Sequence, residues 1–205
     1  MRFFVYFLSA LFIFTTVNSK EFRIDFSDEG MKLLKKRGFG KKTIYTNGKD
    51  DKGWFLKAEA NDSATGLGME IDKELLNEMP FLNITFKIEK DFTNIDQTSK
   101  GGHDWAARVM VGHGKKFGSK LLSLSHSSFL DEGFLQQSPW TKGSRDYVIS
   151  NDTSNEWHTR KINVKELLEK THNISFTNFL AIFTDSNNSE QKIIAYYRDI
   201  YFSDK

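Results

Sequence analysis

The sequence predicts an all-β fold, a jelly-roll-type antiparallel β-sandwich with two or three short helices. Several segments alternate apolar and polar residues with a period of two, which is typical of strands with one buried face. Helical patterns are few, and no helix of about 10–15 residues alternates regularly with strands, as a parallel α/β sheet requires. About eight strands separated by turn residues therefore favour a sandwich.

The strands are expected where this alternation is clearest. In residues 104–111, Val109 lies on the apolar side of the predicted strand and Arg108 lies on the opposite side. The same pattern predicts the other strands at residues 22–26, 54–60, 81–88, 120–129, 146–150, 159–164, 179–185 and 192–202.

Short helices are expected at three places between the strands. Residues 28–37 begin with acidic side chains and end with basic ones, an order that the helix dipole favours. Asp72 can cap a helix over residues 73–79. Asn163 and Glu166 have the spacing of a capping box at the start of a third helix.

The N-terminal residues predict export from the cell. Arg2 precedes an apolar run over residues 3–14, and small residues stand before the expected cleavage point. The run is shorter than the roughly 20 apolar residues that span a bilayer. We therefore expect a signal peptide at residues 1–19, a single domain at residues 20–205, and a secreted or periplasmic bacterial protein without a transmembrane segment after cleavage. An uncleaved membrane anchor is the alternative.

Composition and motifs argue against several classes of function. The chain has 29 Lys and Arg against 27 Asp and Glu, and a net charge of +2 is too balanced for general capture of nucleic acid. Cysteine is absent and the five histidines lack HxxxH or HxH spacing, so a zinc site is not expected. Residues 112–120 are rich in Gly and Lys but lack the spacing of a P-loop. We expect no cofactor.

The best candidate site is a polar face of a sheet. Asp104 and Arg108 are four residues apart on one predicted strand, so they project to the same side, about 13 Å apart. If neighbouring strands adjoin this one, their polar side chains complete a groove, and a loop tryptophan adds stacking surface. The candidate ligand-binding residues are Asp104, Arg108, Lys57, Glu59, Lys87 and Trp140.

Two other interpretations of these residues stay open. The face is a solvated surface if its charges only form weak pairs between strands. Alternatively, Asp104 and Arg108 belong to a network that is buried under a covering loop.

A structural calcium ion is a further hypothesis. Asp25, Asp28 and Asp199 meet if the first and last strands pair, and calcium prefers oxygen ligands of this kind. Residues 185–188 are Asp-Ser-Asn-Asn and are equally rich in oxygen, but Asp and Asn also favour turns for backbone reasons.

Several segments carry a family resemblance: GKKTIY at 40–45, WFLKAEANDSATGL at 54–67, PFLNITFKI at 80–88, HDWAARVMV at 103–111, the segment from Trp157 to Ile162, and LAIFTDSNNSEQKIIAYYRDIYF at 180–202. In wording and order they resemble the bacterial domain of unknown function family 3047. The resemblance implies an exported β-sandwich of unknown activity, with Asp104, Arg108 and Asp185 at hallmark positions. More loosely, IDFSDEG near the start and YRDIYF near the end are similar to the first and last strands of galactose-binding-like jelly rolls, which include many carbohydrate-binding modules.

Together these features predict a non-catalytic protein that binds a saccharide ligand on its polar face. One alternative is a hydrolase or lyase that acts on a cell-envelope polysaccharide, with Asp104 or Glu59 as the acid–base residue. The other alternative is an envelope module for protein–protein interaction, which an exposed apolar patch would indicate.

Overall fold

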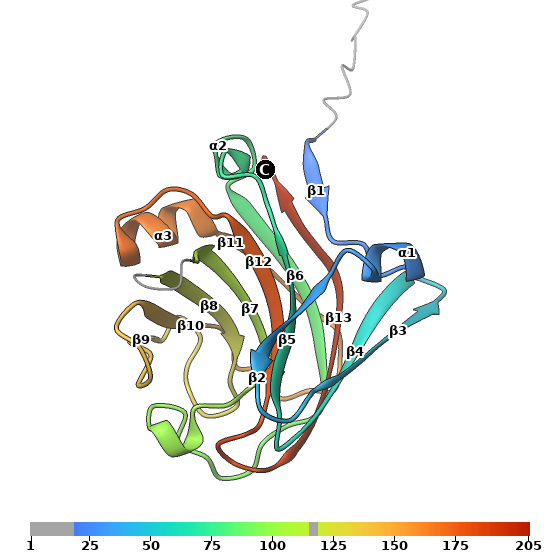
Figure 1. Ribbon diagram of the computed structural model, residues 1–205, viewed down its shortest axis with the longest axis vertical. Helices are drawn as coiled ribbons and strands as arrows, with labels where there is room; N and C mark the ends of the chain where they lie inside the picture. The colour runs from blue at the N-terminus through green and yellow to red at the C-terminus, as the bar shows by residue number, and fades with distance from the viewer. Residues whose placement is uncertain (1–18, 115–118) are drawn as a thin grey trace, which may run out of the picture.

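Two packed β-sheets make up the fold in the computed structural model, which describes residues 19–114 and 119–205 (Figure 1). The six-stranded sheet has the order β11 (His158–Asn163), β6 (Phe81–Lys90), β13 (Lys192–Ser203), β4 (Gly53–Asn61) and β3 (Ile44–Asp50), with β1 (Glu21–Arg23) also paired to β13. The seven-stranded sheet has the order β2 (Lys35–Phe39), β5 (Ala64–Glu70), β12 (Phe179–Asp185), β7 (Trp105–His113), β8 (Lys120–His126), β10 (Ser144–Ser150) and β9 (Leu135–Gln137). The predicted signal peptide, apart from Ser19, and part of the segment 112–120 lie outside the described residues.

Strand pairing confirms the predicted β-sandwich with one exception to the antiparallel pattern. All other neighbours run antiparallel, whereas β8 and β10 are parallel. A parallel pair requires a long crossover connection, and residues 127–143 provide it. This connection places Trp140 beside the outward face of the seven-stranded sheet, where it lines a cavity together with Leu121 of β8.

The period of two in the sequence decides which side chains fill the core between the sheets. Leu56 of β4 and Phe86 of β6 are buried from one side, and Val109 of β7 and Ile182 of β12 are buried from the other. Alternate residues on β7 and β12 therefore point outward, away from the six-stranded sheet. This outward set includes Arg108.

The helices are short, as predicted, but one of them is misplaced. The described helices are α1 (Asp28–Met31), α2 (Leu75–Glu78), α3 (Val164–His172) and the 3-10 turn η1 (Lys100–Gly102). Asn163 caps α3, because its side chain accepts a hydrogen bond from the Glu166 amide at 3.1 Å. None of the described helices is long and apolar enough to cross a membrane.

The helix predicted over residues 28–37 is wrong beyond its first turn. Only Asp28–Met31 is helical, and Lys35–Phe39 forms strand β2 at the edge of the seven-stranded sheet. The basic residues that suggest a helix C-terminus instead occupy an edge strand, where positive charge discourages pairing with another chain.

Candidate functional site

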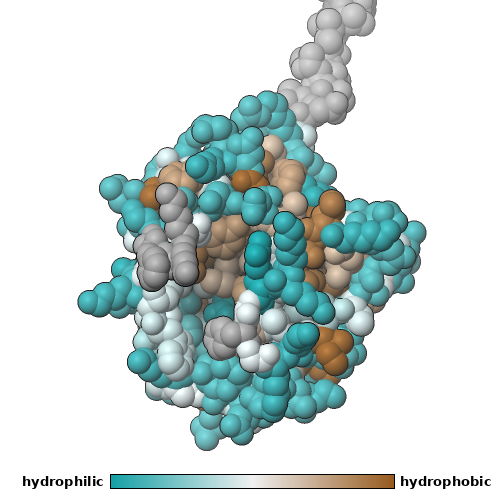
Figure 2. All heavy atoms as spheres, viewed as in Figure 1, coloured by the Kyte–Doolittle hydropathy of each residue, from teal (hydrophilic) through white to brown (hydrophobic). Residues whose placement is uncertain are grey.

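A trough runs along the outward face of the seven-stranded sheet. Two cavities of about 560 Å³ and about 400 Å³ lie there, and they adjoin because both are lined by Met110, Leu121 and Phe183. Figure 2 shows a recess with an apolar floor near the centre of this face. The six steps from Phe179 to Asp185 along β12 give the trough a length of about 20 Å. We call the larger cavity the apolar end and the smaller cavity the polar end.

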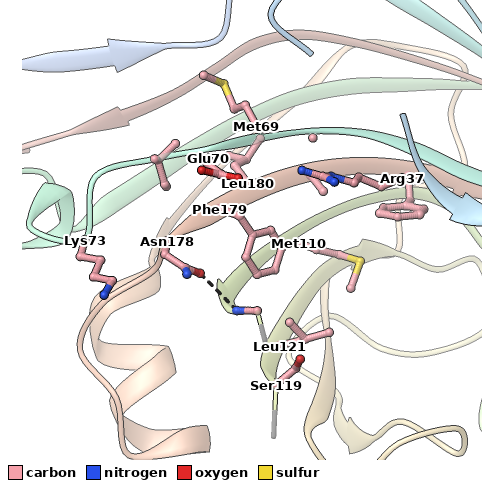
Figure 3. Close-up of a pocket in the computed structure, with 15 residues that line it drawn as sticks. Arg37, Met69, Glu70, Lys73, Met110, Ser119, Leu121, Asn178, Phe179 and Leu180 are labelled. Carbon is pink, nitrogen blue, oxygen red and sulfur yellow. Dashed lines mark hydrogen bonds between the residues drawn. The ribbon is translucent and has the colours of Figure 1, made fainter. Parts of the chain in front are cut away.

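The apolar end has an aromatic and methionine lining with charge at its margin. Phe179 and Met110 point into it, and Arg37 and Lys73 lie at its sides (Figure 3). On β5 a glycine stands where a larger residue would collide with the Phe183 ring of the lining. A Cβ atom at Gly66 would stand 2.7 Å from the ring of Phe183, so glycine there lets this ring lie across β5.

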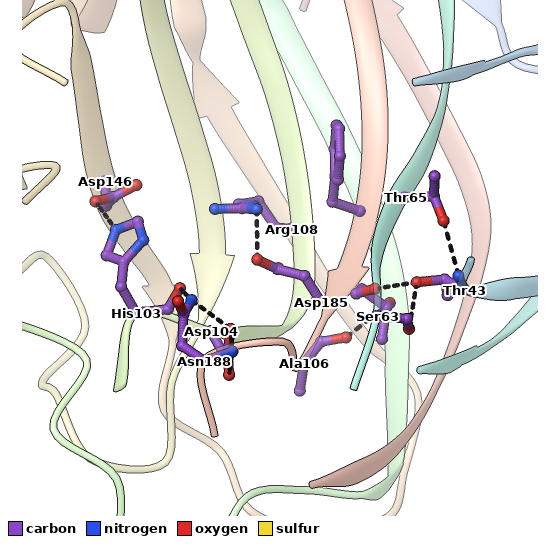
Figure 4. A network of polar contacts seen from close by, with 12 residues as sticks. Thr43, Ser63, Thr65, His103, Asp104, Ala106, Arg108, Asp146, Asp185 and Asn188 are labelled. Atoms are coloured by element: carbon purple, nitrogen blue, oxygen red, sulfur yellow. Dashed lines mark hydrogen bonds and ion pairs between the residues drawn. The ribbon is translucent and has the colours of Figure 1, made fainter. Parts of the chain in front are cut away.

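Two hydrogen-bonded pairs, each of a carboxylate and a basic side chain, lie at the polar end (Figure 4). His103 Nε2 is 2.7 Å from Asp146 Oδ2, and Arg108 Nη2 donates a hydrogen bond of 2.9 Å to Asp185 Oδ2. His103, Arg108 and Asp185 line the cavity, and the side chains of both pairs are at most 10% exposed. Arg108 Nε and one oxygen of each carboxylate have no hydrogen-bond partner among the described residues. The polar end therefore holds buried groups with spare hydrogen-bonding capacity.

Burial changes the acidity of Asp185. The loss of solvent raises the pKa of its carboxyl group to about 6, although Arg108 opposes this shift. The nearby carboxylate of Asp104 raises the pKa further, whereas His103 lowers it. The carboxyl group of Asp185 therefore binds or releases a proton close to neutral pH.

A bulge in β12 and a tyrosine from the other sheet position the Arg108–Asp185 pair. The register between β12 and β7 shifts between Phe183 and Asp185, which marks a β-bulge. Bulges of this kind are common next to functional sites. The hydroxyl of Tyr197 on β13 crosses the core to this point. It donates to the Phe183 carbonyl at 2.6 Å, accepts from the Arg108 amide at 3.2 Å, and lies 2.8 Å from Thr184 Oγ1.

Tyr197→Phe is expected to lower the free energy of unfolding by about 2–4 kcal/mol, because it leaves buried backbone groups of the bulge without a partner. Urea unfolding followed by circular dichroism measures this change. Tyr201→Phe is the control, since the Tyr201 ring is partly exposed, and we expect a change within about 0.5 kcal/mol. Equal effects of the two substitutions would show that the hydroxyl of Tyr197 does not support the bulge.

Asp104 does not line the trough, contrary to the sequence prediction. It precedes β7 and is fully buried, and its carboxylate accepts hydrogen bonds from the amides of Asn188 and Ser189 at 3.0 and 2.7 Å. The side-chain amide of Asn188 adds a third donor at 2.8 Å. Asp104 therefore fixes the turn between β12 and β13. The buried-network interpretation is correct for Asp104, but its partners belong to this turn and not to Arg108.

Lys57, Glu59 and Lys87 lie on the outward face of the other sheet, so the predicted single polar face is wrong. β4 and β6 flank β13 in the six-stranded sheet, whereas Arg108 is on β7 of the seven-stranded sheet. Lys57 Nζ is 3.3 Å from Glu59, and Lys87 Nζ lies 4.6 Å from the ring centre of Tyr196. These three residues interact with their own sheet and are separated from Arg108 by the core.

The three aspartates of the calcium hypothesis have separate partners. Asp25 accepts hydrogen bonds from Ser27, Asp28 accepts one from Asn47, and Asp199 pairs with Arg23 at 2.5 Å. Within residues 19–114 and 119–205 no group of three His, Cys, Asp or Glu residues is arranged to hold a metal ion. β1 and β13 do pair, as this hypothesis required, but the pairing does not bring the three carboxylates together.

Two groups at the polar end were not predicted as site residues. His103 and Asp146 are 43 positions apart and meet only because β10 pairs with β8 in the same sheet as β7. The sequence gives only a weak signal for Asp146: the residue shares one side of its strand with Ser144 and Val148, opposite the core residue Ile149. Of the predicted ligand-binding residues, the structure brings Arg108 and Trp140 together at one cavity.

The fold and the site define a β-sandwich with a trough on the outward face of one sheet. The chain belongs to the family described as "Protein of unknown function (DUF3047)", whose sequence profile matches residues 33–201. A search of curated proteins finds no match.

Solved structures share the sandwich at low sequence identity. A family 11 carbohydrate-binding module from Clostridium thermocellum, in complex with a β-1,3-1,4-mixed-linked tetrasaccharide, is 10% identical with a TM-score of 0.49, and the match covers 89% of this chain and 94% of that one. A family 30 module of a cellulosomal cellulase from the same organism is 8% identical with a TM-score of 0.46, covering 83% and 90%. The xyloglucanase domain of NopAA from Sinorhizobium fredii is 11% identical with a TM-score of 0.43, covering 83% and 92%. Likenesses this loose do not assign a function.

Proposed function

We propose that this chain binds a saccharide chain in the trough of the seven-stranded sheet. The observation that carries the proposal is the combination, in one trough, of apolar rings with buried polar groups that retain free hydrogen-bonding capacity. A sugar ring has apolar C–H faces that stack on aromatic side chains and hydroxyl groups that need several donors and acceptors. The length of about 20 Å suits an extended oligosaccharide better than a single small molecule.

Trp140 is the residue best placed to stack on a sugar. It lines the polar end, and it is 57% exposed, which is unusual for a tryptophan. Lys100 Nζ lies 5.2 Å from its ring centre and covers part of it without burying it. Arg108 and Asp185 lie on the wall of the same cavity and supply the donors and acceptors for hydroxyl groups.

The structure changes which residues an enzymatic alternative would use. Asp104 is saturated with hydrogen bonds and Glu59 lies on the other sheet, so neither acts as an acid–base residue in the trough.

The interaction-module alternative depends on Phe129, Phe134 and Leu135, which are exposed within the crossover segment 127–143. Export to the periplasm or the cell exterior, predicted by residues 1–19, forms part of the proposal.

Trp140→Ala is expected to weaken saccharide binding about 30-fold, which corresponds to about 2 kcal/mol for a central aromatic contact. The melting temperature should stay unchanged, because the ring is mostly exposed. Affinity electrophoresis through gels that contain β-glucan, xylan, sodium polygalacturonate or sodium alginate measures the binding. Phe129→Ala is the matched control, since Phe129 is an exposed ring that does not line the trough. Unretarded migration of the wild-type chain in every gel would overturn the proposal.

A further inference from the structure

The polar end contains a buried histidine–aspartate pair that sugar binding alone does not require. In His103–Asp146 a buried carboxylate fixes the orientation and tautomer of an imidazole, an arrangement that proteins use for proton transfer. With the proton on Nε2, which donates to Asp146, the lone pair of Nδ1 remains for a ligand in the cavity. Figure 4 shows the His103 ring next to Asp146, with the Arg108–Asp185 pair to the right of both.

The guanidinium group of Arg108 can bind two carboxylates at once. One amino group donates to Asp185, while the Nε–H has no partner among the described residues. A guanidinium group presents five donors in a plane, which suits a second carboxylate. An incoming carboxylate would share the charge of Arg108 with Asp185. The ionised form of Asp185 would then lose part of its stabilisation, so an anionic ligand favours the protonated form of this side chain.

We propose that the ligand is a glycan containing 4-linked hexuronic acid, and that this chain cleaves it by β-elimination at the polar end of the trough. The inference rests on the proposed saccharide function and extends it from binding to chemistry. It replaces the expectation of a non-catalytic protein, and it uses three groups that line one cavity: a carboxylate-binding arginine, a base and an acid.

Each group has one role in the elimination. Arg108 binds the uronate carboxylate and neutralises its charge, which makes the C5 proton more acidic. Nδ1 of His103 takes this proton, and the electron pair forms the C4=C5 double bond as the C4–O4 bond breaks. Asp185 gives its proton to the departing O4 oxygen. The products are a chain with a new reducing end, whose anomeric hydroxyl is the protonated O4 oxygen, and a chain that begins with the C4=C5 unsaturated uronate, and no oxidant or cofactor is consumed. Asp146 is a positioning residue.

The acidity of Asp185 agrees with its role. Burial raises the pKa of this carboxyl group to about 6, so more of it carries a proton near neutral pH than of an exposed aspartate. The titratable and charged groups around Asp185 are Arg108, Asp104 and His103, and only the first binds the uronate in the proposed step.

The test incubates the chain with sodium polygalacturonate, sodium alginate or sodium hyaluronate. The ultraviolet absorbance of the conjugated C4=C5 bond reports elimination, and affinity electrophoresis with the same polymers reports binding. We expect a rise in absorbance with at least one polymer. His103→Gln should lower the rate at least about 100-fold while binding is retained. Asp146→Asn should slow the reaction and shift its pH profile, which a purely structural role would not do.

A second buried histidine pair offers a matched control. His126 Nε2 lies 2.9 Å from Asp91 but lines neither cavity, so His126→Gln perturbs a similar pair without touching the trough. We expect its elimination rate to match that of the wild type. Arg108→Lys keeps the positive charge but loses the planar fork, and it should raise KM. Circular dichroism checks that every variant is folded.

Each remaining outcome decides between the two proposals. Binding of a uronate polymer without any rise in absorbance overturns the elimination and leaves saccharide binding intact. Retention only by neutral β-glucan or xylan overturns the uronate specificity in the same way. Equal rates for the wild type and His103→Gln overturn the assignment of the base. Failure to bind any polymer, charged or neutral, overturns both proposals.

Discussion

Arg108→Met should lower the free energy of unfolding by about 3–4 kcal/mol at about pH 9, because it leaves the buried carboxylate of Asp185 without its cation. The sign of the pH dependence follows from the pKa of Asp185, which lies at about 6 in the folded chain. Below this pH the carboxyl group of Asp185 is protonated and uncharged, so the removal of Arg108 lowers the free energy of unfolding by a smaller amount. The difference between variant and wild type should therefore grow as the pH rises through about 6.

A double-mutant cycle separates the charge from the packing. Arg108→Met combined with Asp185→Leu removes both charges and should recover much of the stability that the single variant loses. Lys57→Met is the control, since Lys57 and Glu59 form a partly exposed pair, and it should cost less than about 1 kcal/mol. Chemical denaturation at several pH values measures all of these changes. An unchanged midpoint for Arg108→Met would show that the pair contributes nothing to folding.

Local patterns in the sequence predict the side of each strand but not its neighbours. The alternation in residues 104–111 correctly separates the core residue Val109 from Arg108, because neighbouring side chains on a strand point to opposite faces. The order of strands depends on long-range pairing, which no local pattern records. Lys87 and Arg108 therefore fit one predicted face in the sequence but lie on different sheets.

The alternation of apolar and polar residues does not predict strands of unusual composition, and the reasons are physical. β5 has the sequence ATGLGME, and its glycines lower the expected strand propensity. It is nonetheless a paired strand, and Gly66 is needed there so that the ring of Phe183 can approach the backbone. The sequence pattern assigns residues 35–37 to the end of a helix because their basic charge suits a helix C-terminus, although the same charge also suits an edge strand.

The candidate site was only partly predictable because its pairs join distant strands. Arg108 and Trp140 were identified from residue type and position, and both line the polar end. Their partners depend on the register: Asp185 lies at the bulge in β12, and Asp146 lies on β10, which reaches its place through the crossover segment. A single sequence carries no signal for such contacts beyond the alternation of each strand.

Asp104→Asn should destabilise the fold by about 3 kcal/mol or more, although the substitution is nearly isosteric. The carboxylate of Asp104 accepts hydrogen bonds from the amides of Asn188 and Ser189 and from the side chain of Asn188. An asparagine amide presents one acceptor oxygen and a donor NH2 group, so at least one of these buried donors would face another donor. The turn between β12 and β13 should loosen. Because Asn187 and Asn188 line the polar end, ligand binding should weaken as well.

Chemical denaturation gives the stability change of Asp104→Asn, and hydrogen exchange at the amides of Asn188 and Ser189 shows whether the turn has opened. Asp199→Asn is the control, because Asp199 pairs with Arg23 at the exposed surface and its removal should cost less than about 1 kcal/mol. If Asp104→Asn unfolds at the wild-type midpoint with both amides still protected, then the buried carboxylate does not hold the turn. The polar end of the trough would in that case owe its shape to the Arg108–Asp185 pair on the outward face and to the Tyr197 hydroxyl, which reaches the same bulge through the core.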